Sequence, residues 1–168
     1  LLGLAVVVPK QGFDDLLRMS CEIGIDIVQP LRSERSVVLK GGEKKNHRWQ
    51  CVLRESVEQS ERLWAPELRG MIDIKDWLKN RPLNSALAFA SPRMLPLNRF
   101  HLWTESFKTQ LDQLWIAIGP EGGWTEQEKY FAKETGCFEL YLGDSILRTS
   151  TAAVVATQLM VSWRQNGS

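Results

Sequence analysis

Two glycine-containing segments hold the side chains of this chain that are best suited to chemistry. The first is IGPEGG, residues 118–123, and the second is LGDSILRT, residues 142–149. Each has one group that can bind or stabilise charge: Glu121 in the first and Arg148 in the second. Glycine lets a ligand approach the main chain closely, so both segments are candidate binding sites. Each segment taken alone has a structural alternative. Residues 118–123 could be a plain turn with Glu121 exposed, and Arg148 in the second segment could be a surface residue paired with an acid.

The surroundings of Arg148 favour a binding role. Arg148 stands just before a predicted helix, where the helix dipole disfavours a cation. A cation in that place indicates an anionic partner, such as a carboxylate, a phosphate or an anionic transition state. Ile146 and Leu147 are apolar residues in the same loop, and they either line a pocket or an interface or fill the base of the core. The IGPEGG segment is neither a P-loop nor the dinucleotide fingerprint GxGxxG.

Two further polar clusters, RSERS at residues 32–36 and EQSER at residues 58–62, could bind phosphate. The stretch from residue 32 to residue 54 holds seven basic residues and two acids. A local basic patch can bind phosphate although the net charge of the chain is only +1. A solvated loop and helix face is the alternative explanation.

Hydrophobic patterning predicts the elements that position these groups. Short apolar runs predict strands over residues 2–8, 25–31, 68–72, 85–90, 114–118 and 138–142, with a short strand at 37–39. Helical spacing predicts helices over residues 12–23, 46–63, 74–78 and 104–112. Thr125 and Glu128 form a capping box that begins another helix, which Gly136 ends. Thr149 or Ser150 can cap the last helix.

The alternation of strands and helices predicts a single α/β domain, with a mostly parallel sheet flanked by helices. In such sheets ligands bind beyond the carboxyl ends of the strands. Residues 118–123 and 142–149 each follow a predicted strand, so we expect them to form two walls of one pocket.

Composition excludes several classes of protein. The 168 residues are 43% apolar and 24% charged, which is typical of a globular protein. The longest apolar run, LLGLAVVV, is far too short to span a bilayer and lacks the layout of a signal peptide, so we expect no membrane partner. Three cysteines without a CxxC pair and two histidines argue against a zinc site. Free thiols predict a reducing, cytoplasmic location.

Four motifs together resemble one family: SERSV (33–37), EQSER (58–62), IGPEGGWTEQE (118–128) and LGDSILRTSTAA (142–153). They are similar to those of the small-subunit ribosomal RNA uridine-N3 methyltransferases, which belong to the knotted SPOUT class. The match covers nearly the whole chain in the family's order. The resemblance implies that residues 1–168 form the methyltransferase domain, with a C-terminal deep trefoil knot, in a homodimer whose active site lies near the dimer interface.

Members of this family carry an RNA-binding domain of PUA type before the methyltransferase domain. The chain starts inside a predicted strand, so we expect that domain to be absent from it. We therefore expect the isolated chain to bind its cofactor but to methylate RNA poorly.

The resemblance also implies the cofactor, the substrate and the site residues. The cofactor is S-adenosylmethionine, the target is N3 of a uridine in small-subunit ribosomal RNA, and no metal takes part. Arg148 is implied to stabilise the uridine anion, and Glu121 to orient Arg148 or act as a general base. Ser33, Arg35, Gln59 and Arg62 are implied to bind RNA. The residues implied to bind the cofactor are Phe89, Ile118, Gly119, Pro120, Gly122, Gly123, Leu142, Gly143, Ile146, Leu147 and Thr151.

One departure from the family keeps other functions open. The family usually reads Leu-Arg-Thr-Glu-Thr-Ala, and this chain has Ser150 in place of the Glu. Ser150 can still cap a helix, but any role of that Glu in orienting Arg148 is lost. A non-catalytic, knotted RNA-binding factor of ribosome assembly is one alternative. A ribose 2′-O-methyltransferase of the same class and a generic nucleotide-binding α/β domain are the others.

Overall fold

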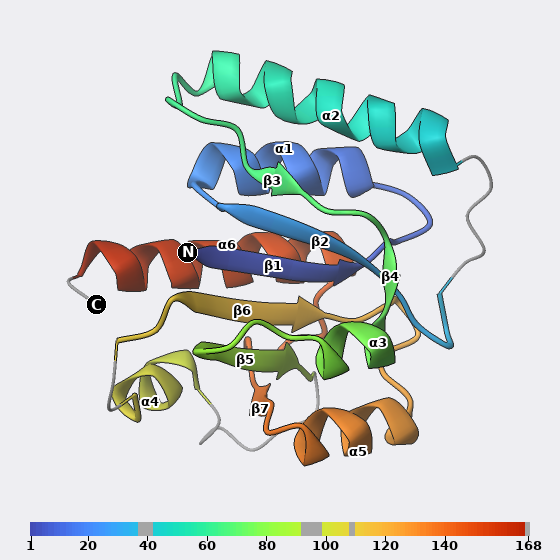
Figure 1. Cartoon of the computed structure of the whole chain (residues 1–168), viewed down its shortest axis with the longest axis vertical. Coiled ribbons are helices and arrows are strands. Elements are labelled where there is room, and N and C mark those ends of the chain that lie inside the picture. The colour runs from blue at the N-terminus through green and yellow to red at the C-terminus, as the bar shows by residue number, and fades with distance from the viewer. Residues whose placement is uncertain (37–41, 92–98, 108–109, 167–168) are drawn as a thin grey trace.

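The computed structural model describes residues 1–36, 42–91, 99–107 and 110–166. Its centre is a seven-stranded sheet in the order β3-β2-β1-β6-β5-β7, with β4 also paired to β2 (Figure 1). Every pairing between these strands is parallel, as the alternating pattern predicts. The strands are β1 (Leu2–Val7), β2 (Ile27–Arg32), β3 (Glu67–Leu68), β4 (Ile72–Asp73), β5 (Ser85–Ala90), β6 (Gln113–Ile118) and β7 (Phe138–Leu140).

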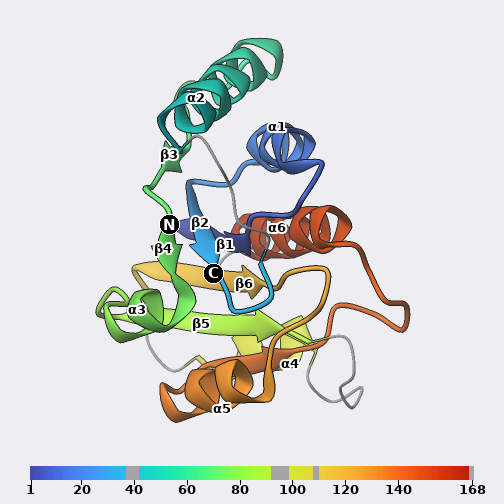
Figure 2. The same ribbon diagram turned by 90° about the vertical axis from the view of Figure 1, so that its right-hand side faces the viewer.

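Helices cover both faces of this sheet (Figure 2). The helices are α1 (Phe13–Ile23), α2 (Gly42–Gln59), α3 (Ile74–Lys79), α4 (Phe100–Glu105), α5 (Glu126–Glu134) and α6 (Thr149–Gln165). One core cluster joins α1, α4 and α6 to the sheet, with α2 packed outside α1. A second cluster joins α3 and α5 to the opposite face. The predicted α/β fold with a parallel sheet and flanking helices is therefore confirmed.

Central strands are apolar on both faces because both faces are covered. In β1, Leu4 and Val6 belong to the first core cluster, whereas Ala5 and Val7 belong to the second. All four side chains are fully buried. This burial explains why the strand is a continuous apolar run in the sequence rather than an alternating one.

Helix α2 begins and ends earlier than predicted. It covers Gly42–Gln59 rather than residues 46–63. Glu61 adopts a left-handed conformation with φ of 54°. The N–H of Glu61 donates to the carbonyl of Glu58 (3.4 Å), and that of Arg62 to the carbonyl of Val57 (3.1 Å). These two bonds are the pattern that closes a helix at its carboxyl end, so Arg62 lies beyond α2.

Two other predicted elements differ from the structure. The strand predicted at residues 68–72 is divided into β3 and β4, because the side-chain amide of Gln29 donates to the carbonyl of Gly70 between them (2.7 Å). The helix predicted at residues 104–112 is wrong over residues 106–107 and 110–112, and residues 108–109 lie outside the described residues. Helix α4 instead lies over Phe100–Glu105, where Phe100 and Trp103 are buried. The short strand predicted at residues 37–39 lies outside the described residues.

In the part of the chain that the structure describes, no helix is both long enough and apolar enough to cross a bilayer.

The packing of Gly3 against Trp115 gives a test of the core. A Cβ built on Gly3 would lie 2.3 Å from the ring of Trp115, whereas one on Gly70 would meet nothing within 4 Å. Gly3→Ala should lower the free energy of unfolding by about 1–3 kcal/mol, because a fully buried indole must move. Gly70→Ala is the matched control and should stay within about 0.5 kcal/mol of the wild type. Urea unfolding measures both variants, and equal stabilities would contradict the packing described here.

Candidate active site

A pocket of about 380 Å³ lies at the carboxyl ends of β5, β6 and β7. Its walls are residues 118–124, which follow β6, and residues 142–149, which lead from β7 to α6. Residues 90–91 at the end of β5, together with Arg35, complete it. The two glycine-containing segments therefore share one cavity, as the sequence predicts.

The first wall depends on the missing side chain of Gly119. A Cβ on Gly119 would lie 2.9 Å from the indole of Trp124, so only glycine lets this buried ring close over the end of β6. The indole N–H of Trp124 then donates to the carbonyl of Ala90 at the end of β5 (3.0 Å). Gly123 turns the chain with a φ of 69°, and its N–H donates to the carbonyl of Pro120 (2.8 Å).

Thr149 attaches the second wall to the first. Its hydroxyl donates to the carbonyl of Gly119 over 3.0 Å. The prediction that Thr149 or Ser150 caps α6 is wrong, because the N-cap is Arg148 and no side chain caps the helix. The hydroxyl of Thr149 bonds to β6 instead and draws the start of α6 to the pocket.

A buried carboxylate joins the start of α5 to the segment that follows β2. The predicted capping box is present, since Glu128 accepts from the N–H of Thr125 (2.8 Å) and Thr125 Oγ1 accepts from the N–H of Glu128 (3.2 Å). The second carboxylate oxygen of Glu128 accepts from the N–H of Glu34 over 3.0 Å. Glu128 is 2% exposed, so both bonds are shielded from water.

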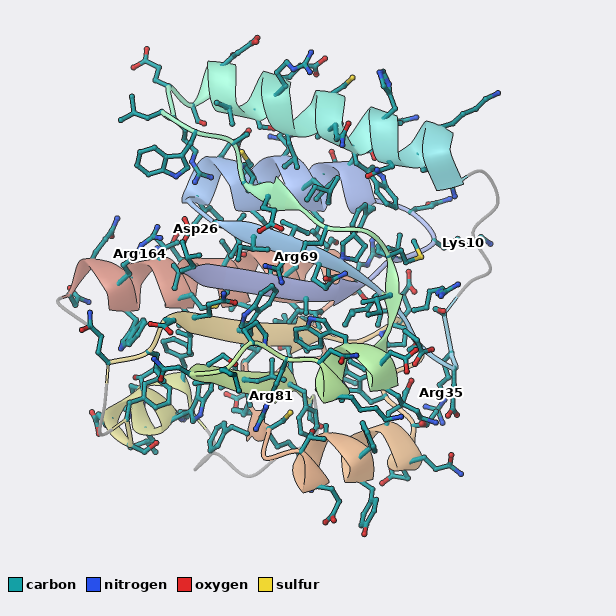
Figure 3. The ribbon with its side chains drawn as sticks, viewed as in Figure 1. Lys10, Asp26, Arg35, Arg69, Arg81 and Arg164 are labelled. Carbon is teal, nitrogen blue, oxygen red and sulfur yellow. The ribbon has the colours of Figure 1, made fainter. Side chains whose placement is uncertain are left out.

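Arg35 brings a positive charge to the pocket from the β2 side. Its Nη1 donates to the carbonyl of Gly122 over 2.7 Å, and the side chain lines the pocket. Figure 3 shows Arg35 and Lys10 at the same edge of the sheet, opposite the edge that holds the Arg164–Asp26 ion pair. Glu126 and Lys129 also line the pocket and pair with each other (2.8 Å). The hydrogen bond from Lys129 lowers the pKa of Glu126.

Comparison with known proteins identifies the family. The family model of the RNA methyltransferase domain matches residues 2–161. The chain belongs to this family. Ribosomal RNA small subunit methyltransferase E of Synechocystis sp. is 35% identical over 156 residues, which are 91% of this chain and 50% of that protein.

Two solved structures resemble this RNA methyltransferase domain closely. Ribosomal RNA small subunit methyltransferase E from Neisseria gonorrhoeae, bound to S-adenosyl methionine, has a TM-score of 0.85 and 29% identity over 96% of this chain and 65% of that one. A Legionella pneumophila protein, solved in complex with the cofactor SAM, has the same TM-score and 25% identity over 96% of this chain and 66% of that one. The chain thus spans about half the length of the Synechocystis relative and about two thirds of these structures.

Most residues predicted to bind a cofactor line the pocket of the methyltransferase domain. The exceptions are Phe89 and Thr151. Phe89 is 3% exposed and packs in the core on the α3 and α5 side. Thr151 is exposed on α6. The residues that do line the pocket are Ile118, Gly119, Pro120, Gly122, Gly123, Leu142, Gly143, Ile146 and Leu147.

The two predicted catalytic residues lie at the margin of the pocket. Glu121 lines it, and its carboxylate accepts from the N–H of Lys10 over 3.2 Å. Arg148 is exposed, and its neighbours Leu147 and Thr149 line the pocket while Arg148 does not. Among the described residues, Arg148 has no ion pair with Glu121 or any other acid. The guanidinium is therefore available to a ligand, but the predicted contact with Glu121 is not present.

The residues predicted to bind RNA are divided between two edges of the sheet. Ser33 and Arg35 follow β2 at the pocket edge, whereas Gln59 and Arg62 lie at the other end of α2. The guanidinium of Arg62 donates to the carbonyls of Cys21 (2.6 Å) and Ile25 (3.0 Å). These bonds favour a structural role for Arg62, because they use its donors within the fold. The structure does not bring Gln59 or Arg62 to the pocket.

Several residues of the pocket were not predicted as site residues. Ser91 comes directly after β5. Because ligands bind beyond the carboxyl ends of parallel strands, its position in the sequence could have identified it, as it identified the two glycine-containing segments. Trp124 had no local signal, because its role depends on a contact with another strand. Thr149 lies in the predicted wall at residues 142–149, but its bond to Gly119 could not be read from the sequence. The other unpredicted residues that line the pocket are Ala90, Glu126, Lys129, Ser145 and Ala152. Within the described ranges, no group of His, Cys, Asp and Glu side chains could hold a metal ion.

The bond between Thr149 and Gly119 gives a test of how the two walls are joined. Thr149→Val keeps the shape of the side chain and leaves the Gly119 carbonyl without its donor, which should cost about 1–3 kcal/mol of stability. Thr151→Val, on the exposed side of the same helix turn, is the control and should change stability by less than about 0.5 kcal/mol. Chemical denaturation compares the two, and a harmless Thr149→Val would show that the hydroxyl does not hold the walls together.

Proposed function

We propose that this chain is the methyltransferase domain of an enzyme that uses S-adenosylmethionine to methylate N3 of a uridine in small-subunit ribosomal RNA. The observation that supports it best is the pocket between residues 118–124 and 142–149, in a chain that belongs to the RNA methyltransferase domain family. The Synechocystis and Neisseria proteins are named ribosomal RNA small subunit methyltransferase E, and the latter was crystallised with the cofactor.

The residues of the pocket fit the cofactor. Its volume of about 380 Å³ lies within the range of small-molecule sites, about 300–1,000 Å³. Ile118, Leu142 and Leu147 offer apolar surface to an adenine ring. Gly143, where a Cβ would meet nothing within 4 Å, leaves main-chain groups accessible for hydrogen bonds with the adenine and ribose. When bound, S-adenosylmethionine supplies an electrophilic methyl group on a sulfonium.

Arg148 would act on the substrate. N3 of uridine is protonated at neutral pH, so its anion must be stabilised before it can accept a methyl group. Arg148 would place its guanidinium beside the uracil carbonyls, where negative charge develops, and so lower the energy of the transition state. Glu121 would orient Arg148 when the substrate is bound, or act as the general base, and we favour the first role. The apolar wall would exclude water, which strengthens these electrostatic interactions.

The substrate would be a uridine in a loop of the RNA, because a base is reachable only when it is splayed out of a helix. Arg35 and the residues around it would bind RNA phosphate or base edges at the mouth of the pocket. Ser33 belongs to the same segment. These roles are supported by the position of Arg35 on the pocket and by the positive charge that it brings there.

We also infer a homodimer, a C-terminal trefoil knot and a cytoplasmic location. The dimer is supported by Ile146, an apolar residue that is 75% exposed beside the pocket. The knot is supported by the resemblance of the four motifs to the SPOUT class. The cytoplasmic location is supported by the ribosomal RNA substrate and by three free cysteines.

The proposed function is tested by identifying the product. Calorimetry should detect binding of S-adenosylmethionine to the protein. Incubation with tritiated cofactor and small ribosomal subunits should label the RNA, and mass spectrometry of the digested RNA should find 3-methyluridine. A methyl group on a ribose 2′ oxygen would contradict the proposal and favour the related class of 2′-O-methyltransferases. Cofactor binding without any transfer, also when the chain is joined to an RNA-binding domain of PUA type, would favour a non-catalytic assembly factor.

The catalytic role of Arg148 is tested separately. Arg148→Ala should lower kcat by about 10²–10³-fold, as expected for the loss of one donor to a developing anion. The affinity for S-adenosylmethionine should stay unchanged, because Arg148 does not line the pocket. Arg18→Ala, at an exposed position on α1 outside the basic stretch at residues 32–54, is the control and should keep full activity. Near-normal turnover of Arg148→Ala with cofactor bound would show that another group stabilises the anion.

A further inference from the structure

Glu128 makes one contact more than a helix cap requires. In a capping box the carboxylate accepts a single N–H, from the residue that caps the helix. Here the carboxylate accepts from Thr125 (2.8 Å) and also from Glu34 (3.0 Å), which lies 94 residues away in the sequence. At 2% exposure, a carboxylate with two N–H donors is held firmly, because hydrogen bonds to a charged group are strong and directional.

The second contact fixes a segment that borders the pocket. Residues 33–36 form a tight turn, in which the N–H and the hydroxyl of Ser36 both donate to the carbonyl of Ser33 (3.1 and 2.7 Å). Glu34 is the second residue of this turn, and Arg35 is the third. Arg35 extends from the turn to the carbonyl of Gly122 and lines the pocket. The hydrogen bond that the N–H of Glu34 donates to Glu128 therefore fixes the position of the main chain from which the Arg35 side chain extends.

The side chain of Glu34 has a different partner. It accepts from Nζ of Lys75 on α3 over 2.9 Å, at an exposed position. An exposed ion pair contributes little to stability. The main chain and the side chain of Glu34 thus make two separable contacts, one with Glu128 in the interior and one with Lys75 at the surface.

We propose that Glu128 is a positioning residue for RNA. It holds the turn at residues 33–36 against the start of α5, so that Arg35 is fixed beside the cofactor pocket and can contact the RNA while the target base lies in the pocket. Glu128 touches neither ligand. It acts through the main chain of Glu34, and its effect reaches the substrate through Arg35. This inference rests on the proposed function, because it takes RNA as the partner of Arg35.

The contact can be removed without changing Glu128. Glu34→Pro deletes the N–H that Glu128 accepts, and proline suits the second position of a tight turn. Glu34→Ala is the matched control, because it removes the ion pair with Lys75 and keeps the N–H. Glu128→Gln is a second variant, because its single amide oxygen can accept the N–H of Thr125 or that of Glu34 but not both.

The measurements are KM for small ribosomal subunits, the affinity for S-adenosylmethionine, and hydrogen exchange of residues 33–36. Glu34→Pro should raise KM for the subunits by about tenfold, the size of losing one hydrogen bond to a charged group. Glu128→Gln should raise KM by that amount or less, because its one oxygen is shared between two N–H groups. Their cofactor affinity should stay within about twofold of the wild type. Exchange at residues 33–36 should become faster, and Glu34→Ala should match the wild type in all three measurements.

Three results would overturn the inference. The first is a normal KM in Glu34→Pro. The second is an equal rise of KM in Glu34→Pro and Glu34→Ala, which would assign the effect to the side chain. The third is a loss of cofactor affinity as large as the change in KM, which indicates general damage to the pocket. If the wild type transfers no methyl group even when it is joined to an RNA-binding domain of PUA type, the proposed function fails. Hydrogen exchange alone then decides, and unchanged exchange in both variants rejects the role of Glu128.

Discussion

The carboxyl end of β6 at Gly119 is the point on which the rest of the site depends. The absence of a side chain there lets the indole of Trp124 close over the strand end, and its N–H reaches the carbonyl of Ala90 on β5. The carbonyl of Gly119 accepts the hydroxyl of Thr149, which sets the start of α6. One residue thus connects two strands, the turn that precedes α5 and the last helix. The position of both pocket walls follows from these contacts.

The parallel sheet brings the segments of the site together. All strand ends that carry site residues meet at one edge, so segments far apart in the sequence converge there. On one side the pocket offers apolar residues and exposed main chain, which suit a nucleoside-containing cofactor. On the β2 side Arg35 supplies positive charge that suits RNA. Glu128 accepts the N–H of Glu34 on the β2 side and that of Thr125, the residue after the first wall. We infer that cofactor and substrate sites are held together as one rigid unit by buried main-chain contacts.

Local signals in the sequence predicted much of this structure, and tertiary contacts explain the rest. Apolar runs identified β1, β2, β5, β6 and β7, and the capping box at Thr125 identified the start of α5, because each signal is complete within a few residues. The position of the pocket could be predicted because ligands bind beyond the carboxyl ends of parallel strands. The structural role of Arg62 and the second bond of Glu128 could not be predicted, since their partners lie at residues 21–25 and at residue 34. The end of α2 was misplaced because Glu61 adopts a left-handed conformation that is uncommon for glutamate.

A crystal structure of this protein with S-adenosylmethionine is the most direct test of the central claim, that the glycine-containing segments after β6 and β7 form the two walls of the cofactor site. The account predicts that the ligand lies between residues 118–124 and 142–149, with its adenine against Leu142 and Leu147. A ligand bound at any other edge of the sheet, or a pocket that stays empty at saturating cofactor, would contradict it.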